Sequence, residues 1–384
     1  MMKLPMSVPD IDSTDEEAVL QVLRSGRLAL GPRSVEFERA IAQYVGVREA
    51  IVVSSGTAAL HLLIRALGIG PGDEVVVPSF TFAATANVVM YEGAVPVFAD
   101  IEPETYCVDT DDIKAKLSER TKAILVVDVF GHPADWDSLE RIAEHYGLPI
   151  LDDACEALGA EYKGRKIGSY GRAAAFAFYP NKQITTGEGG VIVTNDAALA
   201  AVCRSLRNQG RSEMGPWLEH ERLGFNYRMD EMSAALGLSQ LRRIEQFLAK
   251  RDRVAHWYTE RLKNVPGVRA PVVKPHVRMS WFVYVVTLEE GLDREPVMRV
   301  MEEQGIPTRA YFSPVHLQPY MRERFGYRGG ELPVTESAAR RTIALPFHNN
   351  LTLEEVEMVV DGLRRAVERV GSTRSGASKG SCIR

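Results

Sequence analysis

The segment FYPNKQITTGEGG, from Phe178 to Gly190, lies between two apolar runs that are typical of buried strands. It places a single lysine, Lys182, beside a glycine-rich turn. An amine becomes nucleophilic when burial or neighbouring cations remove its proton, and a short loop that leaves a buried strand offers such an environment. Lys182 is therefore the candidate nucleophile, able to form a Schiff base with a carbonyl group. The alternative is an exposed lysine that simply precedes a β-turn.

A carboxylate is expected near this lysine. The run from Leu148 to Ala154 predicts a buried strand that ends in Asp152 and Asp153. Ligands of α/β sheets bind beyond the carboxyl ends of the strands, so a carboxylate there can face the same pocket as Lys182. Pyridoxal 5'-phosphate (PLP) needs this pair, because a lysine binds its aldehyde and a carboxylate keeps its pyridine nitrogen protonated. We take Asp153 as the nitrogen partner, whereas Asp152 could equally cap the strand end.

A strand, a tight turn and a helix N-terminus in series predict a phosphate site. Ala50 to Ser55 is an apolar, β-branched run, and Gly56 and Thr57 then open an amphipathic helix. A helix N-terminus offers free N–H groups and the positive end of the helix dipole to a phosphate. Such residues also cap many helices that bind nothing. The phosphate assignment therefore depends on the co-occurrence of this turn with Lys182 and Asp153.

Apolar runs alternate with helical patterns along most of the chain. The strand candidates are Ala50–Ser55, Glu74–Pro78, Val95–Ala99, Ala123–Val129 and Pro149–Asp153. With intervening helices such as Trp136–Tyr146, this alternation predicts an α/β fold with a mainly parallel sheet covered by helices on both faces. Met229–Leu262 predicts a long helix, either continuous or broken near Gly237, that leads to a smaller C-terminal domain. In that domain Ser280–Thr287 is a strand candidate and Leu353–Val367 an amphipathic helix.

Five motifs in a fixed order resemble those of a known family. They are SSGTAAL (Ser54–Leu60), PSFTFAATAN (Pro78–Asn87), DDACEALGA (Asp152–Ala160), NKQITTGEGG (Asn181–Gly190) and GFNYRMDEMSAALG (Gly224–Gly237). From about Leu30 to about Leu363 the chain resembles the DegT/DnrJ/EryC1/StrS sugar aminotransferases. The resemblance implies fold type I of the PLP-dependent transferases, with a seven-stranded-type, mainly parallel sheet between helices and a smaller C-terminal α+β domain. The expected boundaries are residues 1–245 for the N-terminal segment and large domain, 246–370 for the small domain and 371–384 for a disordered tail.

The resemblance also implies roles for individual residues. Lys182 would hold the cofactor and later move the proton between two carbons, while Asp153 would pair with the pyridine nitrogen. Phe82 would stack on the cofactor ring. Asn226 would reach the phosphate of the cofactor in a neighbouring subunit, so the expected assembly is a homodimer with shared active sites. The phosphate ligands that the resemblance implies are Ser55, Gly56 and Thr57.

One position departs from the family pattern at the phosphate. The family commonly has serine within a Phe-Ser-Phe sequence in the strand before the lysine, where the hydroxyl binds phosphate. This chain reads FAF there, with Ala177 in place of the serine. Ser54, Ser55, Thr57 or a water molecule would have to compensate for the missing hydroxyl.

A second departure bears on the substrate. Glu156 stands three residues after Asp153, where the family often has glutamine or histidine against the cofactor. A glutamate there resembles the branch that aminates C4 of nucleotide-linked 4-keto sugars, as perosamine synthases do. The presence of Lys182 disfavours the related dehydratases, which use the same cofactor with histidine at that position.

The expected reaction is therefore amino transfer from L-glutamate to a nucleotide-linked keto sugar. The expected substrate is an NDP-4-keto-6-deoxyhexose, aminated at C4 for surface polysaccharide or amino-sugar biosynthesis. The alternatives are a C3-aminating or keto-cyclitol aminotransferase of antibiotic biosynthesis, and a non-catalytic PLP-binding regulatory protein. A dinucleotide-binding dehydrogenase is disfavoured, because the glycine-rich run Gly68–Gly72 follows a helix and enters a strand, the reverse of the order that a pyrophosphate site needs.

Three further polar residues are candidates for substrate contacts. The run Ser313–Leu317, which contains His316, resembles a family segment near the sugar. Arg309 lies where the resemblance implies a contact to the nucleotide diphosphate. Glu188 could steady the lysine loop or simply occupy a turn. The alternative for His316 is a hydrogen-bonded structural residue, and for Arg309 it is a solvated surface charge.

Composition favours a cytoplasmic globular enzyme. The 384 residues are 45% hydrophobic and 25% charged, which suits a large and a smaller domain with sizeable cores. The net charge of −5 and the lack of a basic stripe argue against a nucleic-acid partner. The cysteines have no spacing suited to zinc, which predicts reduced thiols and no metal site, and Cys155 is interpreted as a packing residue. No run reaches the roughly twenty apolar residues of a membrane helix.

Overall fold

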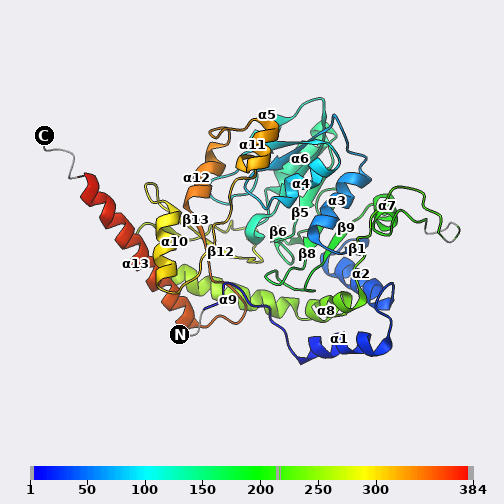
Figure 1. The fold of residues 1–384 in the computed structure, drawn as a ribbon, viewed down its shortest axis with the longest axis horizontal. Coiled ribbons are helices and arrows are strands. Elements are labelled where there is room, and N and C mark those ends of the chain that lie inside the picture. The colour runs from blue at the N-terminus through cyan, green and yellow to red at the C-terminus, as the bar shows by residue number, and fades with distance from the viewer. Residues whose placement is uncertain (1–3, 213–215, 217, 379–384) are drawn as a thin grey trace.

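Seven strands form the central sheet of the large domain, as the computed structural model of residues 4–212, 216 and 218–378 shows (Figure 1). Their order across the sheet is β1-β9-β8-β5-β4-β2-β3. Strand β9 is antiparallel to both of its neighbours, and every other neighbouring pair is parallel. The predicted mainly parallel sheet is therefore confirmed. The strands are β1 (Glu49–Val53), β2 (Glu74–Pro78), β3 (Val95–Ala99), β4 (Thr121–Val127), β5 (Ile150–Asp153), β8 (Ala173–Ala177) and β9 (Gly190–Thr194).

Helices cover both faces of this sheet (Figure 1). One face packs on α3 (Gly56–Ala66), α4 (Ala84–Tyr91) and α7 (Ala197–Arg207). The other face packs on α2 (Pro32–Val45), α6 (Trp136–Tyr146) and α8 (Glu231–Leu241). Alternate strand residues point to opposite faces, so each strand contributes to both cores. This part also contains a short helix, α5 (Thr110–Lys116), and the 3-10 turn η1 (Val129–Gly131). A small separate sheet has the order β11-β6-β7, with β6 (Glu161–Tyr162), β7 (Arg165–Lys166) and β11 (Val277–Arg278).

The long helix predicted over Met229–Leu262 is two helices. Helix α8 ends at Leu241, and α9 (Ile244–Leu262) begins after a break at Arg242 and Arg243. Gly237 does not break the helix. Its role is close packing, because a Cβ at this position would lie 2.6 Å from the ring of Phe37 in α2.

The C-terminal part has its own sheet and core. Its antiparallel sheet has the order β10-β12-β13, with β10 (Val268–Arg269), β12 (Tyr284–Leu288) and β13 (Thr342–Leu345). A separate apolar cluster joins α9 and β12 to the helices packed around them. Among the described residues, no helix is both long and apolar enough to cross a bilayer. The remaining elements are α10 (Arg294–Glu303), the 3-10 turn η2 (Val315–Leu317), α11 (Pro319–Phe325), α12 (Pro333–Arg341) and α13 (Leu353–Ser378).

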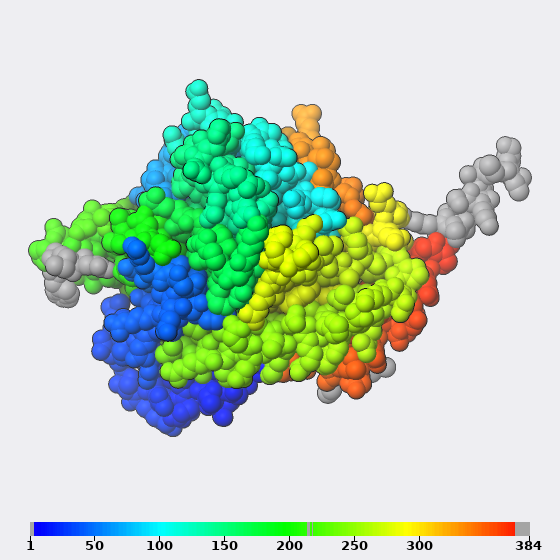
Figure 2. Space-filling view, turned by 180° about the vertical axis from the view of Figure 1, so that it is seen from behind, coloured from blue at the N-terminus to red at the C-terminus, as the bar shows by residue number. Residues whose placement is uncertain are grey.

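The N-terminal segment and helix α13 (Leu353–Ser378) both contact the core of the C-terminal part. Leu4 lies in the C-terminal core, and the Phe347 N–H donates to the Met6 carbonyl, so the chain passes the C-terminal part before it enters α1 (Ser13–Ser25) (Figure 1). Helix α1 then packs beside α8 (Figure 2). Helix α13 extends to Ser378, past residue 371 where the predicted tail begins, and extending a formed helix is far easier than nucleating one. Residues 379–384 of the predicted tail lie outside the described residues.

Candidate active site

A cavity of about 530 Å³ opens at the carboxyl edge of the central sheet. The predicted residues that line it together are Ser55, Gly56, Thr57, Phe82, Asp153, Glu156, Lys182 and Glu188. The C-terminal part contributes aromatic side chains to the same walls, namely Phe282, Tyr311 and Phe312. The cavity therefore lies between the two parts of the chain, where the strand-end rule places ligand sites.

Lys182 points into this cavity. Its side chain is only 13% exposed, and its Nζ lies 3.8 Å from the centroid of the Phe282 ring. The same atom is 3.9 Å from Oε1 of Glu156. The alternative of a solvated lysine before a turn does not describe this side chain. An aromatic face and one carboxylate hold the amine inside the cavity.

Strand alternation separates the two candidate aspartates. Asp153 lines the cavity, and its Oδ2 accepts a 2.6 Å hydrogen bond from the hydroxyl of Thr85. Asp152 faces the opposite core beside Asp128, and burial followed by the charge of Asp128 raises the pKa of Asp152 well above its usual value. Of the two, Asp153 alone can meet a ligand that Lys182 holds.

The start of α3 lies at the cavity wall, where the sequence predicts a phosphate cradle. Ser55 is the N-cap, since its hydroxyl accepts from the Ala58 N–H at 3.0 Å. A Cβ at Gly56 would lie 2.7 Å from the Cβ of Ala177, so glycine lets the helix start approach strand β8. Within the described part of the chain, the Thr57 hydroxyl has no assigned partner, so it is available to replace the serine hydroxyl that Ala177 lacks.

Glu156 is a buried acid beside the lysine. Its Oε2 accepts from the Phe130 N–H at 2.8 Å, while Oε1 faces Lys182. Burial raises the pKa of Glu156 to about 7, although Lys182 opposes that shift. Near neutral pH the protonated and the charged form of this carboxyl are therefore both populated.

Replacing Glu156 with glutamine should make the apoprotein more stable at alkaline pH. The native carboxyl keeps its proton up to about pH 7, whereas the unfolded chain releases it near the usual pKa of 4.5. The native state thus binds more protons in this window, so wild-type stability falls as pH rises through it. Urea unfolding measures the free energy of unfolding of both proteins. The variant should exceed wild type by little near pH 5 and by at most about 3 kcal/mol near pH 8. An equal effect at both pH values would contradict this account.

Three predicted residues lie outside the cavity lining, namely Arg309, Asn226 and His316. Arg309 is exposed, and its side chain donates to the neighbouring Thr308 carbonyl while its backbone pairs with Ala344. Asn226 is exposed and pairs with Asn208. Neither side chain therefore contacts a ligand bound in the cavity of its own chain.

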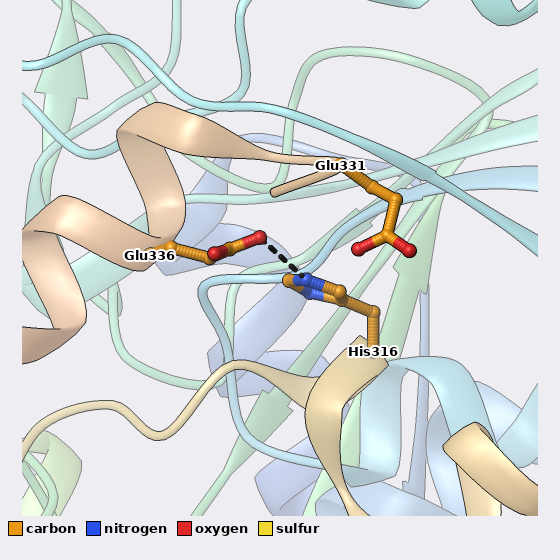
Figure 3. A group of neighbouring side chains, drawn as sticks. All are labelled: His316, Glu331 and Glu336. Atoms are coloured by element: carbon orange, nitrogen blue, oxygen red, sulfur yellow. Dashed lines mark hydrogen bonds and ion pairs between the residues drawn. The ribbon is translucent and has the colours of Figure 1, made fainter. Parts of the chain in front are cut away.

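His316 is fully buried and occupies a structural position (Figure 3). Its Nδ1 lies 2.6 Å from the Ser79 hydroxyl and its Nε2 3.3 Å from a Glu336 oxygen. Burial lowers the pKa of His316, which favours a neutral ring. The ligand atoms of His316, Glu331 and Glu336 lie within 4.8 Å of one another, but both carboxylates already accept backbone N–H groups of the turn at 328–330. His316 does not line the cavity, and its hydrogen bonds match the structural alternative, while a sugar contact stays a prediction.

Sequence reasoning did not find the aromatic wall or the partner of Asp153. Phe282, Tyr311 and Phe312 come from irregular segments of the C-terminal part, and Thr85 from the first turn of α4. A signal for Thr85 existed in the Thr-Phe-Ala-Ala-Thr motif around it. The aromatic residues showed no such pattern, because loops position them.

A buried lysine and carboxylate at the edge of a mainly parallel sheet, beside a helix N-terminus, define the class of fold type I aminotransferases. The chain belongs to the DegT/DnrJ/EryC1/StrS aminotransferase family, whose model matches residues 9–364. It is 41% identical to GDP-perosamine synthase of Caulobacter vibrioides over 94% of this chain and 97% of that protein. It is 37% identical to the spore coat polysaccharide biosynthesis protein SpsC of Bacillus subtilis, over 95% and 97%. Among solved structures, S. venezuelae DesV matches with a TM-score of 0.90 and 36% identity, over 96% of this chain and all of DesV.

The family and its solved PLP forms imply PLP as the cofactor, and the residues of this cavity fit it. Phe82 leaves 66% of its surface exposed at the cavity wall, as an aromatic ring that stacks on a planar ligand requires. Asp153 offers a carboxylate, Lys182 an amine, and the start of α3 offers N–H groups for a phosphate.

Proposed function

We propose that this aminotransferase moves the amino group of L-glutamate to a nucleotide-linked keto sugar. The observation that carries the proposal is the enclosure of Lys182 and Asp153 in one cavity. Bound PLP would supply an electron-accepting ring. The Lys182 amine would hold the cofactor and then move protons at the reacting carbons, because its Nζ is aimed into the cavity and shielded from solvent.

The other cavity residues would bind and orient. The Asp153 carboxylate, fixed by Thr85, would hold a proton on the pyridine nitrogen. Phe82 would stack on the ring, while Gly56, Thr57 and Ser55 would hold the phosphate through the start of α3. Glu188 lies exposed at the rim and would contact the substrate.

The sugar assignment rests on the relatives and on the cavity walls. GDP-perosamine synthase is 41% identical across nearly the whole chain, and SpsC acts in spore coat polysaccharide biosynthesis. The aromatic wall of Phe282, Tyr311 and Phe312 suits the apolar face of a sugar ring. We assign an NDP-4-keto-6-deoxyhexose, aminated at C4, because of Glu156 and the first of these relatives. A C3-aminating or keto-cyclitol enzyme would share the same donor chemistry, so assays with each acceptor class distinguish them.

The visible absorption spectrum of the PLP-loaded protein tests the donor half of the reaction. Addition of L-glutamate should replace the band of the lysine-bound cofactor with that of its amine form. Subsequent addition of a nucleotide-linked 4-keto sugar should restore the first band. An unchanged spectrum with glutamate would refute the proposed donor.

We also propose a homodimer in which each subunit completes the other's site. Asn226 is exposed and outside the cavity of its own chain. Near it along the chain, Leu223 is 75% exposed, and Leu30 in the segment before α2 is 60% exposed. Large apolar side chains at such exposure are suited to burial against a partner. Asn226 would then contact the phosphate bound by the partner chain.

Mixed dimers test this arrangement. Lys182→Ala and Asn226→Ala homodimers should each have little activity, because each site carries one lesion. A mixed dimer places both lesions in one site and leaves the other intact, so random mixing should restore about a quarter of wild-type activity. Turnover that stays at the level of the separate variants, with mixed dimers demonstrated by mass, would place Asn226 in its own subunit's site or in none.

A further inference from the structure

Arg251, in α9, is a buried cation whose hydrogen bonds to described residues all go to main-chain carbonyls. Its side chain is almost fully enclosed, with 3% of the residue exposed. One terminal nitrogen, Nη1, donates to the carbonyls of Trp281 and Phe282 at 3.0 and 3.2 Å. The other, Nη2, donates to the carbonyls of Lys182 and Asn181 at 2.9 and 3.4 Å. One guanidinium therefore connects the lysine loop to the segment that leads into β12.

This arrangement is unusual for a buried charge. Within the described part of the chain, no carboxylate lies at ion-pair distance from Arg251, and its Nε has no hydrogen-bond partner. Burial lowers the pKa of Arg251 to about 10, as expected for a cation without a close counter-ion. Buried charges without a counter-ion are costly, so four carbonyl contacts at this place call for a functional explanation.

The two segments that Arg251 joins meet again at the reacting amine. Lys182 supplies the Nζ, and Phe282 supplies the ring that lies 3.8 Å beneath it. Arg251 holds the carbonyl of each of these two residues, so it fixes the backbone on both sides of the amine–ring contact. A guanidinium suits this task, because its planar fork presents donors in fixed directions to two separate segments.

We propose that Arg251 is a positioning residue that sets the Lys182 amine against the Phe282 ring, and thereby couples the lysine loop to the C-terminal wall of the cavity. This inference rests on the proposed function, since the amine it positions is the one that would hold PLP. Arg251 itself does not line the cavity and acts through the two residues whose backbones it holds.

Hydrogen exchange of the apoprotein tests the connection without the cofactor. The reporting amides are those of Lys182 and Thr186 in the loop, and of Phe282 in the opposite segment, which all donate backbone hydrogen bonds. In Arg251→Met, exchange should accelerate about tenfold or more at both segments together, because local opening controls exchange. The Arg251→Lys variant should show a smaller effect, because one ammonium cannot bridge both pairs of carbonyls.

The control is Arg341→Met. Arg341 also donates to a carbonyl, that of Leu288 at the end of β12, but it lies outside the cavity lining. This variant should leave the exchange of both reporting segments unchanged. If Arg251→Met does not fold, the Arg251→Lys comparison with wild type decides, since it retains the charge and part of the hydrogen bonding.

Turnover provides the second readout. Arg251→Met should lower kcat roughly 10²-fold, with a much smaller change in KM for L-glutamate, because a displacement of about 1 Å at the reacting group has such an effect. Unchanged exchange at both segments together with unchanged kcat would overturn the inference. Wild type that forms no borohydride-reducible bond between Lys182 and PLP would overturn the proposed function instead, while the exchange data would still report on the connection.

Discussion

Replacing Lys182 with alanine should abolish turnover, with kcat reduced about 10³-fold or more, because the chain loses both its cofactor-holding amine and its proton carrier. Within the described cavity lining, no other lysine is present to replace it. Steady-state assays with L-glutamate and a keto sugar measure the loss, and mass spectrometry after borohydride reduction should find no cofactor attached.

Lys163→Ala is the matched control for this variant. Lys163 is a surface lysine that pairs with Asp137 and lies outside the cavity. It should retain wild-type kcat and the reducible cofactor bond. Full turnover by Lys182→Ala would refute the assignment of the reacting amine. If Lys182→Ala loses activity because it is unfolded by circular dichroism, Lys182→Arg replaces it in the borohydride experiment. Lys182→Arg should fold and form no reducible bond with the cofactor.

Replacing Asp153 with asparagine should lower kcat roughly 10²- to 10³-fold, the usual cost of removing one preorganised electrostatic partner. Asparagine has nearly the same shape and can still accept from Thr85, so the fold should survive. It lacks the negative charge that would hold a proton on the pyridine nitrogen. The absorption spectrum should therefore still show cofactor bound to Lys182, while conversion by L-glutamate becomes slow.

The neighbouring aspartate gives an unusually close control. Asp152→Asn changes the adjacent residue in the same strand, but its side chain faces the opposite core beside Asp128. This variant should keep the kcat of wild type. Similar losses in both variants would show that strand integrity, and not the Asp153 charge, explains the effect.

Local rules predicted the half of the site that sits on strand ends. Asp153 is the last residue of β5, while Gly56 and Lys182 lie in the turns after β1 and β8, and the carboxyl ends of parallel strands meet at one edge. The preference for Asp153 over Asp152 was also predicted, although the structure was needed to show their opposite directions. These residues could be found because their positions depend on short segments with clear periodicity.

The other half depends on contacts between distant segments, which no local pattern records. Phe282 and Tyr311 reach the cavity from irregular segments. Arg251 holds the carbonyl of Lys182 from a helix whose sequence resembles that of any amphipathic helix. The break at Arg242 escaped prediction because Gly237 offered a more obvious candidate. For His316 a family resemblance suggests a ligand contact, whereas the structure encloses the side chain in the core.

The cavity has a thermodynamic consequence, because it is built from both parts of the chain. Lys182 and Asp153 come from one side, and Phe282 and Tyr311 from the other. Any occupant that touches both sides acts as a reversible cross-link whose strength follows mass action. At about one hundred times its dissociation constant, such a ligand contributes about 2.7 kcal/mol to the folded state. The free energy of unfolding therefore rises with cofactor concentration, and both parts of the chain that the ligand touches share the gain.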